Sequence, residues 1–206
     1  SNSFDSSWMD AGGFFGYLAQ YVHMTPYFTL IRFGKWEEIL KSQPVPASRV
    51  FSHIIWQYGQ GLAYARKHEF EKANAALEAI RTVMQDPQLQ DHPPAFNAGI
   101  SPAGIAEKIL QGVIAEERGD TGMAIDVLQD AVDKEDAMLY NEPRDWPHPA
   151  RQYLGNTLLK AKQYDAADKV FLEDLKINPD NGWSLTGLYT SLQAQHKNGE
   201  ANAYKA

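Results

Sequence analysis

The chain has 206 residues, of which 44% are hydrophobic and 22% charged, a composition typical of a folded soluble protein. Its formal charge of −7 and the lack of any basic run argue against nucleic acid as a partner, because nucleic-acid binders cluster lysine and arginine. The absence of cysteine excludes disulfides, cysteine-based zinc sites and cysteine nucleophiles.

No apolar run approaches the roughly 20 residues that a membrane span needs, so no membrane-spanning segment is expected. Residues 1–12 are interpreted as a leader or a cloning remnant, and residues 13–206 as one helical repeat domain. The sequence carries no recognisable targeting segment, which leaves the bacterial cytoplasm and the periplasm as equal expectations.

The first predicted elements are an apolar helix at 13–23 and a helix pair at 25–42. The first helix of this pair is expected to begin near Pro26, because a proline in the first turn lacks only an N–H that would be unpaired anyway. Residues 33–40 (FGKWEEIL) are expected to form the turn and the second helix.

Three further pairs are predicted from a recurring spacing, in which glycine is followed by alanine and then by a large apolar residue. The three sets are Gly61, Ala73 and Leu77; Gly112, Ala124 and Leu128; and Gly155, Ala167 and Phe171. Small residues let two helices approach closely, and large ones fill the space to the next pair. The spacing therefore predicts helix pairs at 49–84, 103–135 and 149–178, with a truncated copy at 181–206.

This spacing resembles the tetratricopeptide repeat (TPR), a helix–turn–helix unit of about 34 residues. The resemblance implies an all-α fold, a right-handed superhelical solenoid of antiparallel helix pairs with about four repeats plus flanking helices. Trp36 and Trp183 occupy repeat-type positions and are expected in the core. Two insertions, near 86–102 and 136–148, account for the uneven spacing of the copies.

The second insertion leads into the phrase YNEPRDWPHPAR, which contains three prolines and ends at Arg151. Prolines stop helices and favour extended backbone before them, so one interpretation is a rigid, packed connector anchored by Tyr140 and Trp146. The other interpretation is a ligand or peptide site surrounded by Asp145, Trp146, His148 and Arg151.

A closer resemblance rests on three phrases: LIRFGKWEEIL, YGQGLAYARK, and YNEPRDWPHPARQYLG together with FLEDLKINPDNGWSLTGL. They resemble the C-terminal half of a family of bacterial TPR proteins without established biochemical activity, over about residues 26–192. The family phrase acidic-Pro-Pro-Asp-Trp is altered here at Arg144. The resemblance supports the fold, implies no catalytic residues, and implies further repeats upstream.

No P-loop, dinucleotide fingerprint, zinc-protease helix or nucleophile elbow is present, so neither an enzyme activity nor a cofactor is expected. Asp91 and His92 in the first insertion could converge on a metal ion with Asp145 and His148 in the second. A small-molecule or metal-assisted site, formed by the insertions and the groove of the solenoid, is therefore the alternative function.

The resemblance also implies that the first helices of the pairs line a concave face, with ligand-facing positions around each glycine. These positions are Tyr58, Leu62, Ala65 and Arg66; Ile109, Val113, Glu116 and Glu117; and Gln152, Asn156, Leu159 and Lys160. Arg66, Asn156 and Lys160 suit a carboxylate ligand. Glu116 and Glu117 lie between them, however, and would repel a carboxylate. We therefore expect a protein-interaction scaffold whose partner has a basic and an apolar feature.

Self-association is a further expectation. Terminal repeats without a polar cap leave apolar surface open, so contact through the exposed terminal helices is predicted. Trp8 in the leader is interpreted as covering one end of the helical stack. A purely structural or self-assembly role follows as a third hypothesis.

Overall fold

The computed structural model describes residues 6–205, and within that range the chain is helical and contains no strand. The all-α prediction is thereby confirmed. The α-helices are α1 (Gly13–Arg32), α2 (Trp36–Leu40), α3 (Val50–Arg66), α4 (Phe70–Val83), α5 (Ile100–Glu117), α6 (Thr121–Asp136), α7 (Ala150–Lys160), α8 (Tyr164–Ile177), α9 (Gly182–Ala194) and α10 (Asn198–Ala201). Short 3-10 helices lie at Ser6–Asp10, Pro87–Gln90 and Asn202–Tyr204. None of the described helices is both long and apolar enough to cross a lipid bilayer.

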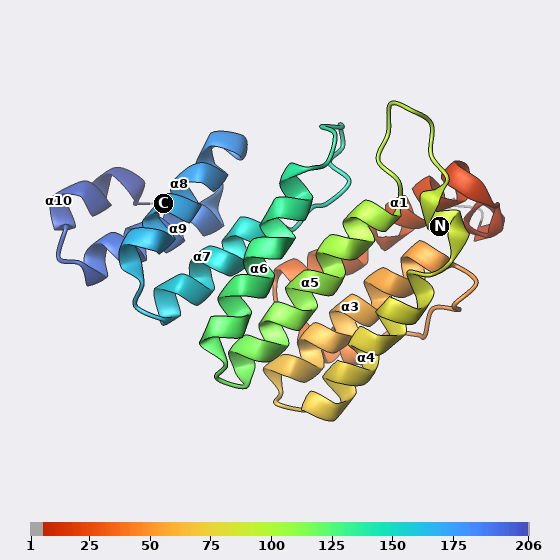
Figure 1. Cartoon of the computed structure of the whole chain (residues 1–206), viewed down its shortest axis with the longest axis horizontal. Coiled ribbons are helices and arrows are strands. Elements are labelled where there is room, and N and C mark those ends of the chain that lie inside the picture. The colour runs from red at the N-terminus through yellow and green to blue at the C-terminus, as the bar shows by residue number, and fades with distance from the viewer. Residues whose placement is uncertain (1–5, 206) are drawn as a thin grey trace.

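Consecutive helices pack as neighbouring pairs, α3 with α4, α5 with α6, α7 with α8 and α9 with α10 (Figure 1). Each pair also packs against the next, so one apolar core runs through the chain. Helices that are amphipathic on their own become stable in this way, because each buries its apolar face against a neighbour.

The predicted small-to-large packing explains how closely the paired helices approach. A Cβ placed on Gly112 would lie 2.6 Å from Leu128 Cγ, and one on Gly155 would lie 2.6 Å from the Phe171 ring, so neither position has room for a side chain. The first glycine has a different large neighbour. A Cβ placed on Gly61 would lie 2.5 Å from Leu110 of the next pair and 3.3 Å from Ala76 of its own pair.

The turns inside the pairs share one geometry. A residue with left-handed backbone follows the first helix at His68 (φ 58°), Gly119 (φ 83°), Lys162 (φ 59°) and His196 (φ 62°). The N–H of the next residue then donates back to a helix carbonyl, for example from Asp120 to Ala115 O at 3.0 Å. The turn between α1 and α2 repeats this pattern at Gly34, so these two helices form a pair of the same kind.

Helix α1 corrects the prediction for the N-terminal region. It is one continuous helix, and Pro26 lies inside it rather than at the start of a new helix. The buried side of α1 compensates for the backbone hydrogen bond that proline removes, since Tyr27, Phe28 and Ile31 all lie in the core. Pro26 itself lies on the exposed side of the helix.

Helix α1 packs against α3 and passes behind α3 and α5 in the view of Figure 1. The Tyr27 ring lies against Gly59, where a placed Cβ would be 2.5 Å away, and its hydroxyl donates to Trp56 O at 3.2 Å. Gln20, which is buried, accepts from Ser52 N at 3.0 Å. These contacts fix the N-terminal helix across the side of the paired helices.

The connector, residues 137–149, packs between α1 and α3. Trp146 is buried and makes edge contacts with Phe28 and Tyr58, with ring centroids 5.9 and 5.4 Å apart. The Trp146 indole donates to His148 O at 2.6 Å, and the His148 ring contacts Phe28 O through Nε2 at 3.0 Å. Trp146 therefore anchors the connector, as the first interpretation of this segment predicted, but Tyr140, the other expected anchor, is 71% exposed and does not.

The two insertions contact each other through Asn97. Its side chain accepts from Leu139 N at 2.8 Å, and donates to Leu139 O at 2.8 Å and to Asp145 Oδ2 at 2.7 Å. A buried asparagine thus joins the segment before α5 to the connector before α7. These three hydrogen bonds join the two insertions at Asn97.

Candidate functional site

A groove of about 890 Å³ lies between the α1–α2 turn and the helices α7 and α9. It is open to solvent along one side. The residues that line this groove are Ile31, Arg32, Phe33, Gly34, Trp36, Arg66, Gln152, Tyr153, Asn156, Leu159, Phe171, Gly182, Trp183, Thr186, Gly187 and Thr190.

The lining is aromatic and cationic. Among the described residues, those that line the groove include two arginines and no aspartate, glutamate, histidine or lysine. Phe33 and Trp183 face each other with ring centroids 6.0 Å apart, and both are about half exposed. A surface of this kind favours an apolar ligand that also carries negative charge, in a chain whose overall charge is −7.

Arg32 is the central polar group of the groove. Its guanidinium lies 3.8 Å above the Trp183 ring and donates to Gln152 Oε1 at 2.6 Å. Gln152 in turn donates to Asp174 Oδ2 at 3.0 Å, and this carboxylate is fully buried. These two hydrogen bonds fix the position of the Arg32 guanidinium but place no carboxylate directly against its positive charge.

No carboxylate of the described residues pairs directly with Arg32, although the charge of the buried Asp174 acts on it from beyond Gln152. Within residues 6–205, no carboxylate oxygen lies within 4.0 Å of its guanidinium. Burial lowers the pKa of Arg32, because half of the side chain has lost contact with water. A half-buried and unpaired guanidinium is costly, and an anionic ligand would remove that cost.

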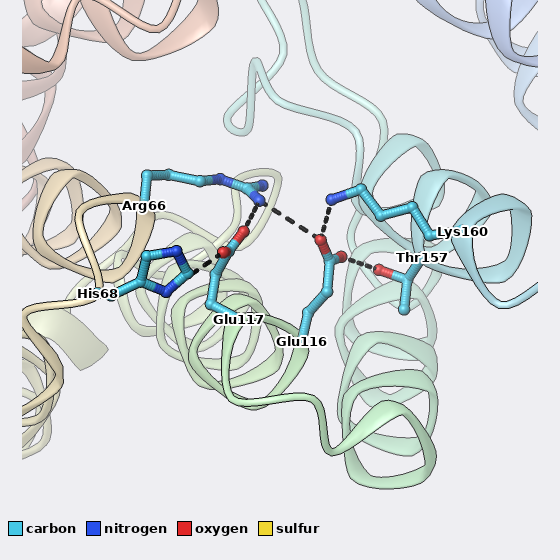
Figure 2. A network of polar contacts seen from close by, with 6 residues as sticks. All are labelled: Arg66, His68, Glu116, Glu117, Thr157 and Lys160. Carbon is cyan, nitrogen blue, oxygen red and sulfur yellow. Dashed lines mark hydrogen bonds and ion pairs between the residues drawn. The ribbon is translucent and has the colours of Figure 1, made fainter.

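Arg66, at the other side of the groove, belongs to a network of charges (Figure 2). It contacts Glu117 and also Glu116, the latter at 3.4 Å, while Lys160 and Thr157 both donate to Glu116. Burial raises the pKa of Glu116, but the hydrogen bonds from Lys160 and Thr157 outweigh it and hold the pKa below its usual value. Glu116 therefore stays ionised, and both glutamates are paired with basic side chains.

This network bears on the expected partner chemistry. Glu116 and Glu117 are not among the residues that line the groove, and their charges are paired with Arg66 and Lys160. They therefore do not repel a carboxylate in the groove. The expectation of a basic partner rested on those two acids standing exposed between the bases.

The other expected ligand-facing residues divide into two groups. Gln152, Asn156 and Leu159 line the groove, and the half-buried Asn156 amide makes no hydrogen bond with the described residues. The remaining five are at most 1% exposed and lie in the core: Tyr58, Leu62, Ala65, Ile109 and Val113. The connector accounts for one of these, because Trp146 and His148 lie against the Tyr58 ring.

Asp145, Trp146 and Arg151 line a second, smaller pocket of about 190 Å³ at the connector. Two of its charged side chains, Arg151 and Asp145, are already bound within the chain. Arg151 binds Asp136 through two hydrogen bonds of 2.6 Å, and Asp145 accepts from Asn97 at 2.7 Å. His148 lies outside this pocket and inside the core.

Two buried groups near the connector have unusual acidity. Burial lowers the pKa of His148 from 6.5 to about 4, with the nearby Arg32 charge as a second cause. Burial raises the pKa of Glu135 from 4.5 to about 7, although its hydrogen bond from Ala150 N, at 2.7 Å, acts in the opposite direction. Neither group lines the groove.

The described part of the chain, residues 6–205, brings together no three His, Asp or Glu side chains that could hold a metal ion. Asp145 is instead bound to Asn97 and Asn141, and His148 contacts a backbone carbonyl. The proposed convergence of the two insertions therefore takes place through amide groups.

Sequence reasoning missed the residues that matter most in the groove. Trp36 and Trp183 were expected in the core, but both line the groove, and Trp183 is 47% exposed. Arg32 and Phe33 were expected only as helix end and turn. Their position depends on α1 reaching α9, and no local pattern signals a contact between segments so far apart.

No family model, curated protein or solved structure matches the chain, so the TPR resemblance stays a prediction.

Proposed function

We propose that the chain is a protein-interaction scaffold, built as a TPR-like solenoid, whose groove binds a short segment of a partner protein. The segment carries a carboxylate next to an aromatic or aliphatic side chain. The observation that carries this proposal is Arg32, a half-buried guanidinium without a carboxylate within 4.0 Å, in a lining without acidic residues.

The rest of the groove supports the same ligand. Phe33, Trp36 and Trp183 offer flat apolar surface for a large side chain. The free amide of Asn156 also lines the groove, where a peptide backbone can donate and accept hydrogen bonds. Arg32 is held in place by Gln152 and Trp183, so little side-chain entropy is lost on binding.

A catalytic role for the groove has less support. Acid–base chemistry needs groups such as His, Asp, Glu or Lys close to a ligand, and none lines the groove in the described part of the chain. The metal-assisted alternative also lacks a suitable cluster there. The repeat architecture is supported by the common turn geometry and by the close glycine contacts of α5–α8.

The proposal is tested by selecting peptides from a random library on the immobilised protein. The affinity of the selected peptides, made synthetically, is then measured by fluorescence anisotropy. We expect the selected peptides to combine Asp, Glu or a free C-terminus with an apolar residue. Arg32→Gln should weaken their binding about tenfold or more, because a charge-assisted hydrogen bond contributes about 1.5–3 kcal/mol. Phe33→Ser, at a 62% exposed position, should weaken it without affecting the fold.

Arg144→Gln is the matched control. Arg144 is also half-buried and has no carboxylate within 4.0 Å among the described residues, but it lines the connector pocket. Its loss should leave binding within about twofold of the wild type. Three outcomes would each contradict the proposal: selected peptides rich in Lys or Arg, equal binding by the Arg32 variant, or no enriched peptide at all.

A further inference from the structure

Helix α1 has an exposed apolar stripe that the groove does not use. Phe15, Leu18 and Val22 are 79%, 41% and 50% exposed, and their spacing places them on one side of the helix. The opposite side of α1 is buried against α3 and the connector. Apolar side chains in a line of this kind mark an interaction surface.

The stripe is also free of charge. From Gly13 to Ile31, α1 contains no aspartate, glutamate, lysine or arginine, whereas α4, α6 and α8 each carry both signs. In a chain with a net charge of −7, most surfaces of two copies repel each other. The outer side of α1 is a surface on which two copies meet without that repulsion.

The shape of the stripe fits a second copy of itself. In an antiparallel pair of α1 helices, Phe15 of one copy lies opposite Val22 of the other, and the two Leu18 side chains meet near the twofold axis. The largest side chain of the stripe then faces the smallest, as close helix packing requires. A contact in which each surface binds its own copy is the commonest kind in symmetric dimers.

We propose that this stripe, Phe15–Leu18–Val22, is the contact between two copies of the chain in a symmetric dimer. The contact is one helix face wide, which is small for a stable interface, so the dimer is weak, with a Kd on the order of 10 µM. This inference is independent of the groove, because none of the three residues lines it.

The test is sedimentation velocity on the whole chain at concentrations up to roughly 200 µM, well above the expected Kd. We expect the wild type to shift from monomer to dimer across this range. Leu18→Glu and Leu18→Lys should each stay monomeric, because two like charges would meet at the axis. An equal mixture of the two variants should dimerise again, since opposite charges then meet.

Leu172→Glu is the matched control, because Leu172 is 38% exposed but lies on α8. It should dimerise like the wild type, and all variants should keep the wild-type melting temperature. A wild type that stays monomeric throughout would overturn the proposal. So would Leu18 variants that still dimerise, or a mixture that stays monomeric when the wild type dimerises.

Discussion

The helix pairs from α3 to α8 and the N-terminal helix α1 are held in place by different kinds of contact. The pairs rest on close approaches that recur, such as Leu128 on Gly112 and Phe171 on Gly155, and on turns of one geometry. Helix α1 rests on contacts that occur once, such as Phe28 on Trp146. The recurring contacts build the framework, and the single ones create the groove.

The largest expected effect concerns the recurring contacts. Phe171 fills the space at two glycines, since a Cβ placed on Gly155 or Gly187 would lie 2.6 or 2.3 Å from its ring. Phe171→Ala should lower the free energy of unfolding by about 3–5 kcal/mol, because it leaves a cavity between three helices. Urea titration followed by circular dichroism measures this.

Leu172→Ala serves as its control, because Leu172 is the next residue and is 38% exposed. A change of about 0.5 kcal/mol or less is expected there. Similar losses for the two variants would mean that the ring does not hold α7, α8 and α9 together.

The next effect concerns the single contacts of the connector. Trp146→Ala should lower the free energy of unfolding by about 3 kcal/mol, since it removes a buried ring that packs on Phe28 and Tyr58. Hydrogen exchange should quicken in α1 and the connector, while α8 keeps its protection.

Tyr140→Ala is the comparison for Trp146, because this ring belongs to the same connector and is 71% exposed. Its exchange pattern should match the wild type. Faster exchange spread evenly over all helices after Trp146→Ala would show that α1 and the pairs unfold as one unit, contrary to the distinction drawn here.

A third effect is a dependence on pH with opposite signs at two buried groups. The folded-state pKa of His148 is lowered to about 4, so stability falls as pH drops from about 6.5 towards 4 and only the unfolded state gains a proton. The pKa of Glu135 is raised to about 7, so stability rises as pH drops from about 7 towards 4.5. Each contribution is about 3 kcal/mol, and in the wild type they offset each other.

Two variants separate these contributions. Between pH 7 and pH 4, His148→Gln should gain stability relative to its own value at the higher pH, because only the Glu135 contribution remains. Glu135→Gln should lose stability over the same range. Urea midpoints measured across the range decide the matter, and parallel pH profiles for the two variants would refute the assignment.

The smallest effect concerns the common turn. Lys162 has left-handed backbone with φ 59° where another turn has Gly119, and a side chain with this backbone costs energy. Lys162→Gly should therefore raise the free energy of unfolding by about 1 kcal/mol. Gly119→Ala should lower it by a similar amount, and a thermal melt measures both.

The sequence foretold much of the regular region, because its contacts depend on spacing along two adjacent helices. Phe171 packs on Gly187 of the next pair, as expected of a large residue that fills the space between pairs, and also on Gly155 of its own pair. Gly61 lies against Leu110 of the next pair, and the spacing did not indicate this contact because the offset between pairs depends on the length of the insertion.

The groove itself lay beyond prediction for a physical reason. Arg32 becomes half-buried and unpaired only because α1 passes Pro26 without ending and reaches Trp183 on α9. That path depends on the burial of aromatic side chains such as Phe28 against the connector, which is a contact between distant segments. Helix propensity and periodicity describe neighbours along the chain, so they favoured an early end at Pro26.

The most direct test of the groove is a titration of the ¹⁵N-labelled protein with a selected peptide, followed through the indole N–H signals. Trp36 and Trp183 line the groove, whereas Trp146, in the connector, is buried against Phe28 and Tyr58. We expect the Trp183 and Trp36 signals to shift with the peptide, those of Trp146 to stay, and Arg32→Gln to abolish the shifts. Peptide-dependent shifts at Trp146 with none at Trp183 would contradict the account.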